Sequence, residues 1–439
     1  MKQARYLLVL LMMIGVVLFP AAQSSAGKVY IDIDAPGFTQ FPIAVPEFIN
    51  MARRGDDPTL AKESREVLTD DLFMAGIFEL VDPSLYTPSP DKYDRVDKID
   101  SQVWMSLGAE AVIKGGYEMV GDNLVLEMRL YDVVNDSFIF GRRYRGDAED
   151  FSRMVHKFAD ELMLEYTGEP GIFQSMIAFT TDQHGEKEIY IMDIDGRNKI
   201  RCTNNSAIDL SPDWSPDGTK LVYCSFKQRY PRIFTVDITS FVDTLVASYD
   251  GINISPSFSP SGSMIAFTST MDYDANIYVI NASGGGVKKV TSGDIDVSPA
   301  WSPDGSMIAF TSNRGGGPQI YIMNVSTGKV TRLTYSGGYN TSPAWSPKGD
   351  TIAYVGMSAG LFQVYVINTD GSGAMRLTNR GDNENPTWSP DGNIIAFSST
   401  RGGASKIYWM RADGSDQTMI PGTGGNDTSP AWSPRVDFQ

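Results

Sequence analysis

Two sets of polar side chains recur at fixed positions before a repeated motif in the second half of the chain. One set lies five residues before the motif and the other three residues before it, and Pro follows each member of the second set. Their carboxylate, amide and hydroxyl oxygens could bind a hard cation such as calcium or attract a basic partner. The first set is Asp209, Asn253, Asp296, Asn340, Asn383 and Asp427, and the second is Ser211, Ser255, Ser298, Ser342, Asn385 and Ser429.

The motif, WSPDG in its commonest form, predicts the fold of this half of the chain. Its copies are 43 or 44 residues apart. A period of ~40–45 residues made of short strands and turns is typical of a β-propeller with one four-stranded blade per period. The copies begin at Trp214, Phe258, Trp301, Trp345, Trp388 and Trp432, which indicates six blades over residues 171–439.

The two ends of the repeat array predict how the ring closes. An apolar triplet follows each motif copy except the last, at Trp432, and the first triplet, at Ile177, has no motif before it. We therefore expect the strand around Trp432 to supply the inner strand of the blade that holds Ile177. The alternative, an open solenoid, would leave a Trp-bearing edge strand exposed at the terminus.

Sixfold symmetry is expected to place both polar sets around one mouth of the central channel, where they would bind a partner. Weak calcium binding is expected at the three carboxylates, Asp209, Asp296 and Asp427. A local role is the alternative, because Asp, Asn and Ser also cap turns. The sequence does not decide between a structural and a functional role for the two polar sets.

Residues 1–26 have the organisation of a secretory signal peptide. Lys2 and Arg5 precede an apolar run over 7–19 that is too short to span a bilayer, and small residues lead to Ala26. An uncleaved anchor is the alternative, but the small residues favour cleavage. Loss of two basic residues changes the formal charge from −16 to −18. Such an acidic chain is not expected to bind nucleic acid or anionic lipid, and it suits basic partners or cations. The chain is not expected to be embedded in a membrane, because no later run is apolar for long enough to span one.

Residues 40–168 have no repeat and predict a compact α/β domain. A helix should begin at Asp57-Pro58 and end at Gly76, and another should end at Gly168, because Asp and Gly are favoured at helix termini. The remaining predicted elements are a short helix over 99–107, three meandering strands over 111–119, 124–133 and 138–145, and the helix over 151–166 that Gly168 ends.

Residues 27–39 form a separate segment before this domain. Apolar Val29, Ile31 and Ile33 alternate with other residues, as in a strand. The segment is therefore either an edge strand of the domain or an arm that pairs with a partner's sheet, in which case Val29, Tyr30, Ile31 and Ile33 would bind the partner.

The sequence does not predict an enzyme. A G-x-S-x-G match places Ser358 between Gly356 and Gly360, but a nucleophile elbow also needs a helix and a later His. The two His residues, His156 and His184, precede it, and both are expected to be solvated. The spacings of His and Cys match no zinc site, so no cofactor is expected beyond the weak calcium.

The two cysteines, Cys202 and Cys224, lie in neighbouring repeats at positions that other repeats fill with ordinary strand residues. Two buried free thiols are the expected state. A disulfide is the alternative, since an exported protein permits one.

The chain resembles the TolB family of the Tol–Pal system of Gram-negative bacteria over nearly its whole mature length. The resemblance rests on residues 27–48 (GKVYIDIDAPGFTQFPIAVPEF), followed by a domain without repeats and then by the WSPDG and IAF repeats. One departure, Phe258 with Ser261 in the second motif copy, is expected to alter packing rather than function.

This resemblance implies a non-enzymatic periplasmic protein with two partners. Pal, the peptidoglycan-associated lipoprotein, would bind the propeller face around the channel, and the C-terminal domain of TolA would bind the arm. The implied role is to maintain outer-membrane integrity and to draw that membrane inward during cell division. The alternative function is a ligand-binding or peptidase-accessory propeller that senses periplasmic peptides or glycans.

Overall fold

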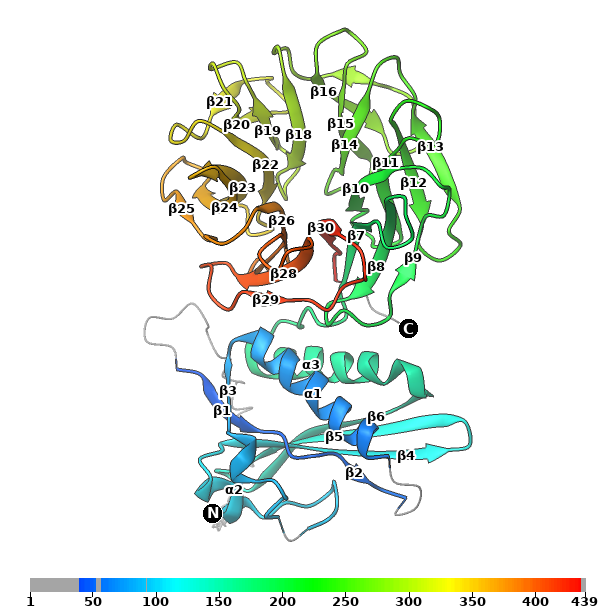
Figure 1. Cartoon of the computed structure of the whole chain (residues 1–439). Helices are drawn as coiled ribbons and strands as arrows, with labels where there is room; N and C mark the ends of the chain where they lie inside the picture. Colours follow the sequence, from blue (N-terminus) through cyan, green and yellow to red (C-terminus); the bar gives the residue numbers. More distant parts are fainter. Residues whose placement is uncertain (1–38, 53–56, 92, 436–439) are drawn as a thin grey trace, which may run out of the picture.

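The computed structural model describes residues 39–52, 57–91 and 93–435. The predicted signal peptide and all but the last residue of the predicted arm lie outside the described residues. The described chain forms an α/β domain beside a six-bladed β-propeller (Figure 1). Within these described residues, no helix is long and apolar enough to cross a membrane.

The α/β domain contains one sheet with strand order β3-β1-β4-β5-β6, and β2 pairs with β4. The predicted meander is confirmed, and β1 adds to it as a parallel neighbour of both β3 and β4. The strands are β1 (Phe41–Ala44), β2 (Ile49–Asn50), β3 (Phe78–Leu80), β4 (Ala111–Val120), β5 (Asn123–Asp132) and β6 (Ser137–Asp147).

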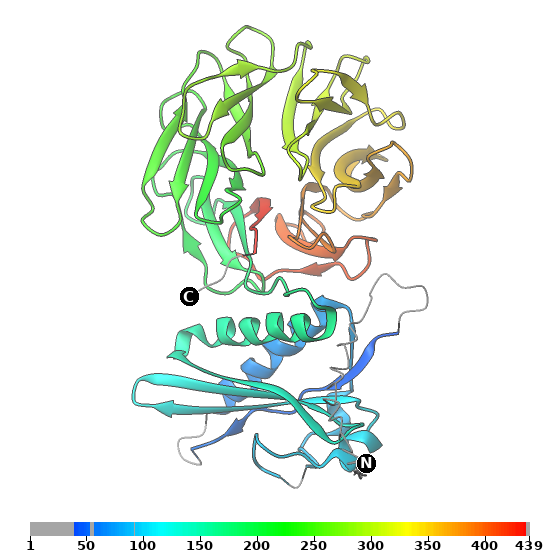
Figure 2. The ribbon, with the colours of Figure 1, turned by 180° about the vertical axis from the view of Figure 1, so that it is seen from behind.

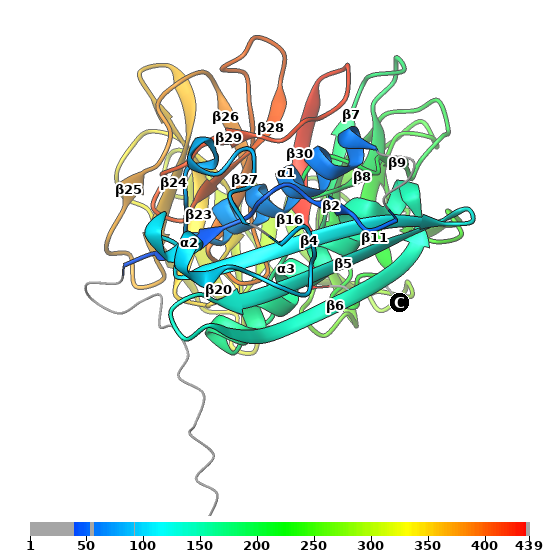
Figure 3. The same cartoon turned by 90° about the horizontal axis from the view of Figure 1, so that it is seen from below.

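Two long helices, α1 (Pro58–Ala75) and α3 (Phe151–Thr167), lie between this sheet and the propeller (Figures 1 and 3). The Asp57 side chain accepts hydrogen bonds from the first backbone N–H groups of α1, and Gly76 ends the helix in the left-handed conformation. Gly168 ends α3 in the same way, so the predicted helix ends are confirmed. Figure 2 shows from behind how α3 runs along the propeller side of the sheet. The shorter helices are η1 (Pro83–Leu85), α2 (Ser101–Ser106) and η2 (Ala148–Asp150).

Each blade is a four-stranded antiparallel sheet, and the inner strand begins at the first polar set and ends at the motif aromatic residue. From the inner to the outer strand, the blades are β10 (Asp209–Trp214), β11 (Lys220–Ser225), β12 (Arg232–Asp237), β13 (Asp243–Ala247); β14 (Asn253–Phe258), β15 (Met264–Ser269), β16 (Asn276–Asn281), β17 (Lys288–Lys289); β18 (Asp296–Trp301), β19 (Met307–Ser312), β20 (Gln319–Asn324), β21 (Val330–Arg332); β22 (Asn340–Trp345), β23 (Thr351–Ser358), β24 (Leu361–Asn368), β25 (Met375–Arg376); β26 (Asn383–Trp388), β27 (Ile394–Ser399), β28 (Lys406–Arg411), β29 (Thr418–Met419); and β30 (Asp427–Trp432), β7 (Met176–Thr181), β8 (Glu188–Asp193), β9 (Ile200–Arg201).

The last of these blades closes the ring as the sequence predicts. β30 pairs with β7, and Trp432 lies opposite Ile177. The indole N–H of Trp432 donates to Ser175 Oγ at 2.7 Å, in the segment that enters the propeller. The two ends of the repeat array therefore complete one blade, and an open solenoid is ruled out.

The cores of the two domains are continuous. Leu72 and Phe158 of the α/β domain belong to the same buried apolar cluster as Phe179, Trp409 and Trp432 of the propeller. This shared cluster fixes the two domains against each other through apolar contact.

The two cysteines are free and buried, as expected. Burial raises the pKa of the thiols of both Cys202 and Cys224 to about 12. Both side chains therefore remain protonated at neutral pH and act as small apolar groups in the blade cores.

Candidate functional site

The second polar set lines the central channel of the propeller. Each inner strand carries a β-bulge at this set, for example between Leu210 and Asp213, and the bulged residue has a φ of +51° to +56°. Ser and Asn tolerate this left-handed backbone because they are small and polar. The channel has a volume of about 530 Å³, and its ring of bulged residues is Ser211, Ser255, Ser298, Ser342, Asn385 and Ser429.

The side chains of this bulge ring have no hydrogen-bond partner within the described part of the chain. Pro follows each of them and also lines the channel, and Pro has no backbone N–H to offer. The ring therefore presents hydroxyl and amide groups that are available to a ligand or to solvent in the channel.

The first polar set does not lie in the channel, and this corrects the sequence prediction. Its six side chains are at most 3% exposed, and each hydrogen-bonds within the propeller wall. Asp296 accepts two hydrogen bonds from Arg314 at 2.8 and 3.0 Å, and Asn383 accepts one from Arg401 at 2.9 Å. These buried caps are Asp209, Asn253, Asp296, Asn340, Asn383 and Asp427, and they tie the start of each inner strand to its neighbouring loops.

The prediction that three members of this set bind calcium is also corrected. Asp209, Asp296 and Asp427 are completely buried in three different blades. Among the described residues, no group of three or more His, Cys, Asp or Glu side chains is close enough to hold a metal ion. The three carboxylates therefore do not converge as a calcium site would require.

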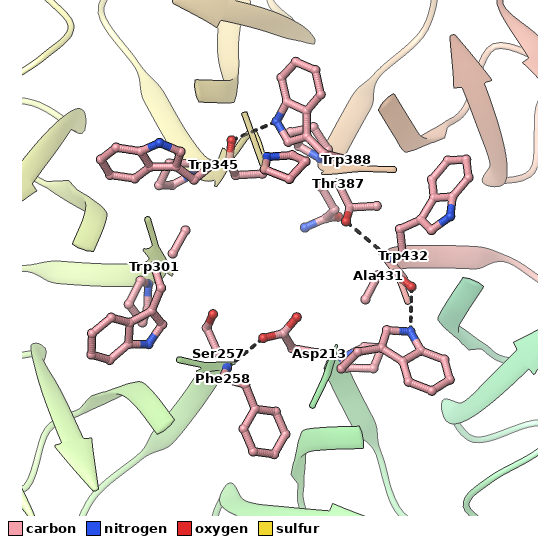
Figure 4. A pocket seen from close by; sticks show the side chains of 18 of the residues that line it. Asp213, Ser257, Phe258, Trp301, Trp345, Thr387, Trp388, Ala431 and Trp432 are labelled. Atoms are coloured by element: carbon pink, nitrogen blue, oxygen red, sulfur yellow. Dashed lines mark hydrogen bonds between the residues drawn. The ribbon is translucent and has the colours of Figure 1, made fainter. Parts of the chain in front are cut away.

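A third position of the inner strands, one residue before each motif aromatic residue, also faces the channel and was not predicted from the sequence. Asp213 occupies it in β10 and projects from the wall toward Ser257 and Phe258 (Figure 4). Asp213 Oδ2 accepts a hydrogen bond from the backbone N–H of Phe258 at 2.8 Å. Burial raises the pKa of this carboxyl to about 6. The six repeats, compared position by position, could have revealed Asp213 as the one charged member of this set.

Hydrogen bonds between neighbouring inner strands stiffen the channel wall. The indole N–H of Trp214 donates to the carbonyl of Ala431 at 3.0 Å, and that of Trp388 donates to Ala344 at 3.1 Å (Figure 4). Phe258 has no such donor. Its backbone N–H donates to the Asp213 side chain of the preceding blade instead.

A buried charged cluster joins the α/β domain to the propeller, and it corrects the prediction that His156 is solvated. His156 of α3 is 1% exposed. Its Nδ1 lies 2.8 Å from Asp71 of α1, and its Nε2 lies 3.4 Å from Asp195 in the turn after β8. We call His156, Asp71 and Asp195 the junction triad.

The two carboxylates stabilise a protonated His156. Although burial opposes the charge, Asp71 and Asp195 raise the pKa of His156 well above its ordinary value. Burial raises the pKa of Asp71 to about 7, against the effect of His156. Burial acts in the same direction on Asp195, but His156 at 3.4 Å and Arg197 at 3.2 Å keep the pKa of Asp195 below its ordinary value.

Further polar contacts surround the junction triad. Arg411 at the end of β28 donates to the carbonyls of Phe73 and Met74 at the end of α1, at 2.7 and 3.2 Å. Arg197 pairs with Glu63 at 3.1 Å. Arg411 thus provides hydrogen-bond donors for carbonyl groups at the C-terminus of α1, and both arginines connect the two domains.

The G-x-S-x-G match is not a nucleophile elbow. Ser358 is the last residue of β23 and pairs with Leu361 of β24 across a hairpin turn. Its hydroxyl accepts a hydrogen bond from Arg376 at 3.1 Å. A strand–turn–strand hairpin lacks the helix that an elbow requires.

Two family models match the chain. The TolB beta propeller domain matches residues 164–436, and the TolB amino-terminal domain matches residues 29–138. The amino-terminal model therefore covers most of the α/β domain, and the propeller model covers the propeller.

Individual relatives agree with these models. The chain is 41% identical over 265 residues to "Tol-Pal system protein TolB" of Desulfosudis oleivorans and 42% identical over 221 residues to that of Geobacter sulfurreducens. The matched segments span 60% and 50% of the length of these two curated relatives. The crystal structure of TolB from Acinetobacter baumannii matches with a TM-score of 0.77 and 27% identity, and covers 90% of this chain and 97% of that one.

Proposed function

The chain belongs to the TolB family, and on that premise we propose that it is a non-enzymatic, periplasmic interaction protein of the Tol–Pal system. The observation that carries this proposal is the bulge ring, which offers polar side chains without protein partners in an open channel. The signal-peptide pattern of residues 1–26 supports export to the periplasm.

Pal is the proposed partner at the channel. The bulge ring supplies hydroxyl donors and acceptors, and the Pro and Trp residues beside it supply apolar walls. Such a mixture of aromatic anchors and adaptable polar groups is typical of protein-binding surfaces. The negative formal charge of the chain favours a partner with basic groups at the contact.

The C-terminal domain of TolA is the proposed partner of residues 27–39. Their alternating Val29, Ile31 and Ile33 suit addition to the edge of a partner's sheet. With one partner at the arm and another at the channel, the chain would connect two envelope proteins. We propose that this connection maintains outer-membrane integrity and supports invagination of the outer membrane during division.

The test measures both partners with one pair of proteins. The mature chain and a variant without residues 27–39 are titrated with the purified periplasmic domain of Pal and the purified C-terminal domain of TolA from the same genome. We expect the deletion to abolish TolA binding and to leave Pal binding and the thermal transition nearly unchanged. If the full mature chain binds neither partner, the proposal is wrong, and a propeller that senses peptides or glycans becomes the better assignment.

A further inference from the structure

The described residues that line the channel include one charged side chain, Asp213. The residues before the motif aromatics all line the channel, and five of the six are small and neutral. The members of this set are Asp213, Ser257, Ala300, Ala344, Thr387 and Ala431. Among all described residues that line the channel, Asp213 is the only one with an ionisable carboxylate or a basic group.

The link between blades at this position does not require a carboxylate. Asp213 Oδ2 accepts the backbone N–H of Phe258 in the next blade at 2.8 Å. Thr387 makes the same type of bond with a hydroxyl, accepting the backbone N–H of Trp432 at 3.2 Å (Figure 4). Since a neutral side chain can form the link, the distinctive contribution of Asp213 is its negative charge.

This charge has no counter-charge nearby. In the described part of the chain, no charged side chain acts on Asp213, and the channel lining contains no Lys, Arg or His. Burial raises the pKa of Asp213 to about 6, so the carboxyl is still mostly ionised at pH 7. A partly desolvated anion is stabilised when a cation enters its site, because Coulomb attraction and a charge-assisted hydrogen bond compensate for the lost solvation.

We propose that Asp213 is a subsite of the channel that accepts the ammonium or guanidinium group of a Lys or Arg side chain from a protein partner. This inference deepens the proposed function and rests on its premise that a partner segment enters the channel. Pro212 and Pro256 also line the channel and offer apolar wall for the methylene stem of such a side chain. A bare calcium ion is a poor occupant, because it requires six to eight oxygen ligands and converging carboxylates.

The first test uses a defined probe with the complete mature chain. A blocked Gly-Ser-Lys-Ser-Gly peptide and its norleucine counterpart are titrated by calorimetry, with the indole N–H signals of the channel Trp residues as a second readout. One charge-assisted hydrogen bond should make the lysine peptide bind about tenfold more tightly at pH 7.5. The absence of any preference for lysine in the wild type would overturn the proposal.

Two variants separate charge from structure. Asp213→Thr keeps a hydroxyl for the link to Phe258, as Thr387 does at its own position, and should abolish the preference for lysine. Asp250→Asn makes the same change in net charge at an exposed position outside the channel lining, and should retain the preference. Equal preference in wild type and Asp213→Thr would overturn the proposal.

The pH dependence of peptide binding by the wild type tests the proposal without relying on the folding of a variant. The preference for lysine should decrease as the pH falls through about 6, where Asp213 takes up a proton. A preference that is constant between pH 5 and 8 would contradict the assignment.

The titration with Pal distinguishes this inference from the proposed function. If wild type and Asp213→Thr bind Pal equally, the subsite is wrong while the partner assignment stands. If Pal does not bind but the wild type prefers the lysine peptide, the subsite stands and the partner assignment is wrong.

Discussion

The channel and the domain junction both contain buried or partly buried polar groups, but they use them in opposite ways. In the channel, six repeats present one polar position each, and these side chains have no partner in the described protein. At the junction, three unrelated elements supply one side chain each, and His156 lies close to both carboxylates. The repeated positions create a surface for recognition, whereas the unique positions fix the two domains together.

The largest loss of stability is expected from a truncation that opens the propeller ring. Truncation after Gly425 removes β30 and with it the buried Trp432 and the inner strand of one blade. Removal of a large core side chain alone costs ~3–5 kcal/mol, a substantial part of the ~5–15 kcal/mol that stabilises a domain. We expect aggregation or loss of cooperative unfolding in a thermal scan. A monomeric truncated protein with an unchanged melting temperature would contradict ring closure.

The repeat period predicts the propeller, its closure and the residues that form the bulge ring, but the position expected for the buried caps is wrong. In a regular strand, Asp209 and Ser211 would face the same side, because side chains alternate with a period of two. The bulge between Leu210 and Asp213 breaks that alternation, so Asp209 points into the blade while Ser211 lines the channel. One-letter patterns do not reveal a bulge, since Ser-Pro is equally compatible with a turn.

At the junction of the two domains, the sequence predicts the burial of single residues but not their contacts. Asp71 lies on the buried face of α1 beside Leu68 and Leu72, so its position in the helical pattern could have marked it as a buried acid. His156 follows Val155 on the buried face of α3 in the same way. Their third partner, Asp195, lies in a distant blade turn, and no periodic pattern connects it with these helices. The triad therefore becomes visible only in the folded chain.

The second prediction removes the cation of the junction. His156→Ala leaves Asp71 without a salt-bridge partner in the described chain, whereas Asp195 keeps Arg197 at 3.2 Å, and breaking a buried ion pair in this way costs ~3–5 kcal/mol. We expect a correspondingly lower free energy of unfolding in urea. His184→Ala changes an exposed histidine and is the matched control with little effect. Equal stability of the two variants would show that the triad does not hold the domains.

The third prediction concerns pH. The pKa of Asp71 is raised to about 7 and that of His156 is raised above its ordinary value, so the folded chain binds more protons than the unfolded chain near neutrality. Stability from both groups is therefore greatest on the acidic side of neutrality and is lost as the pH rises through their folded pKa values, by up to about 1.4 kcal/mol per pH unit for each proton. The double variant Asp71→Asn with His156→Gln should flatten this slope in urea titrations from pH 5.5 to 9. An unchanged slope would contradict this origin.

The fourth prediction separates the two polar sets of the inner strands. Asn340 is 3% exposed and donates to Gln319 and Ser336, so Asn340→Ala should lower the free energy of unfolding by about 1–3 kcal/mol. Ser342→Ala, two residues later in the same strand, removes a hydroxyl without a protein partner and should change stability by less than about 0.5 kcal/mol. Calorimetric melting of both variants checks this contrast, and equal losses would mean that the bulge ring is also structural.

The decisive measurement is the affinity of Pal for the mature chain and for the triple variant Ser298→Ala, Ser342→Ala and Ser429→Ala, by titration calorimetry. Three weak hydrogen bonds at ~0.5–1.5 kcal/mol each should be lost from the channel, which predicts at least about tenfold weaker binding with an unchanged thermal transition. Equal affinity of the two proteins would show that the partner does not use the channel.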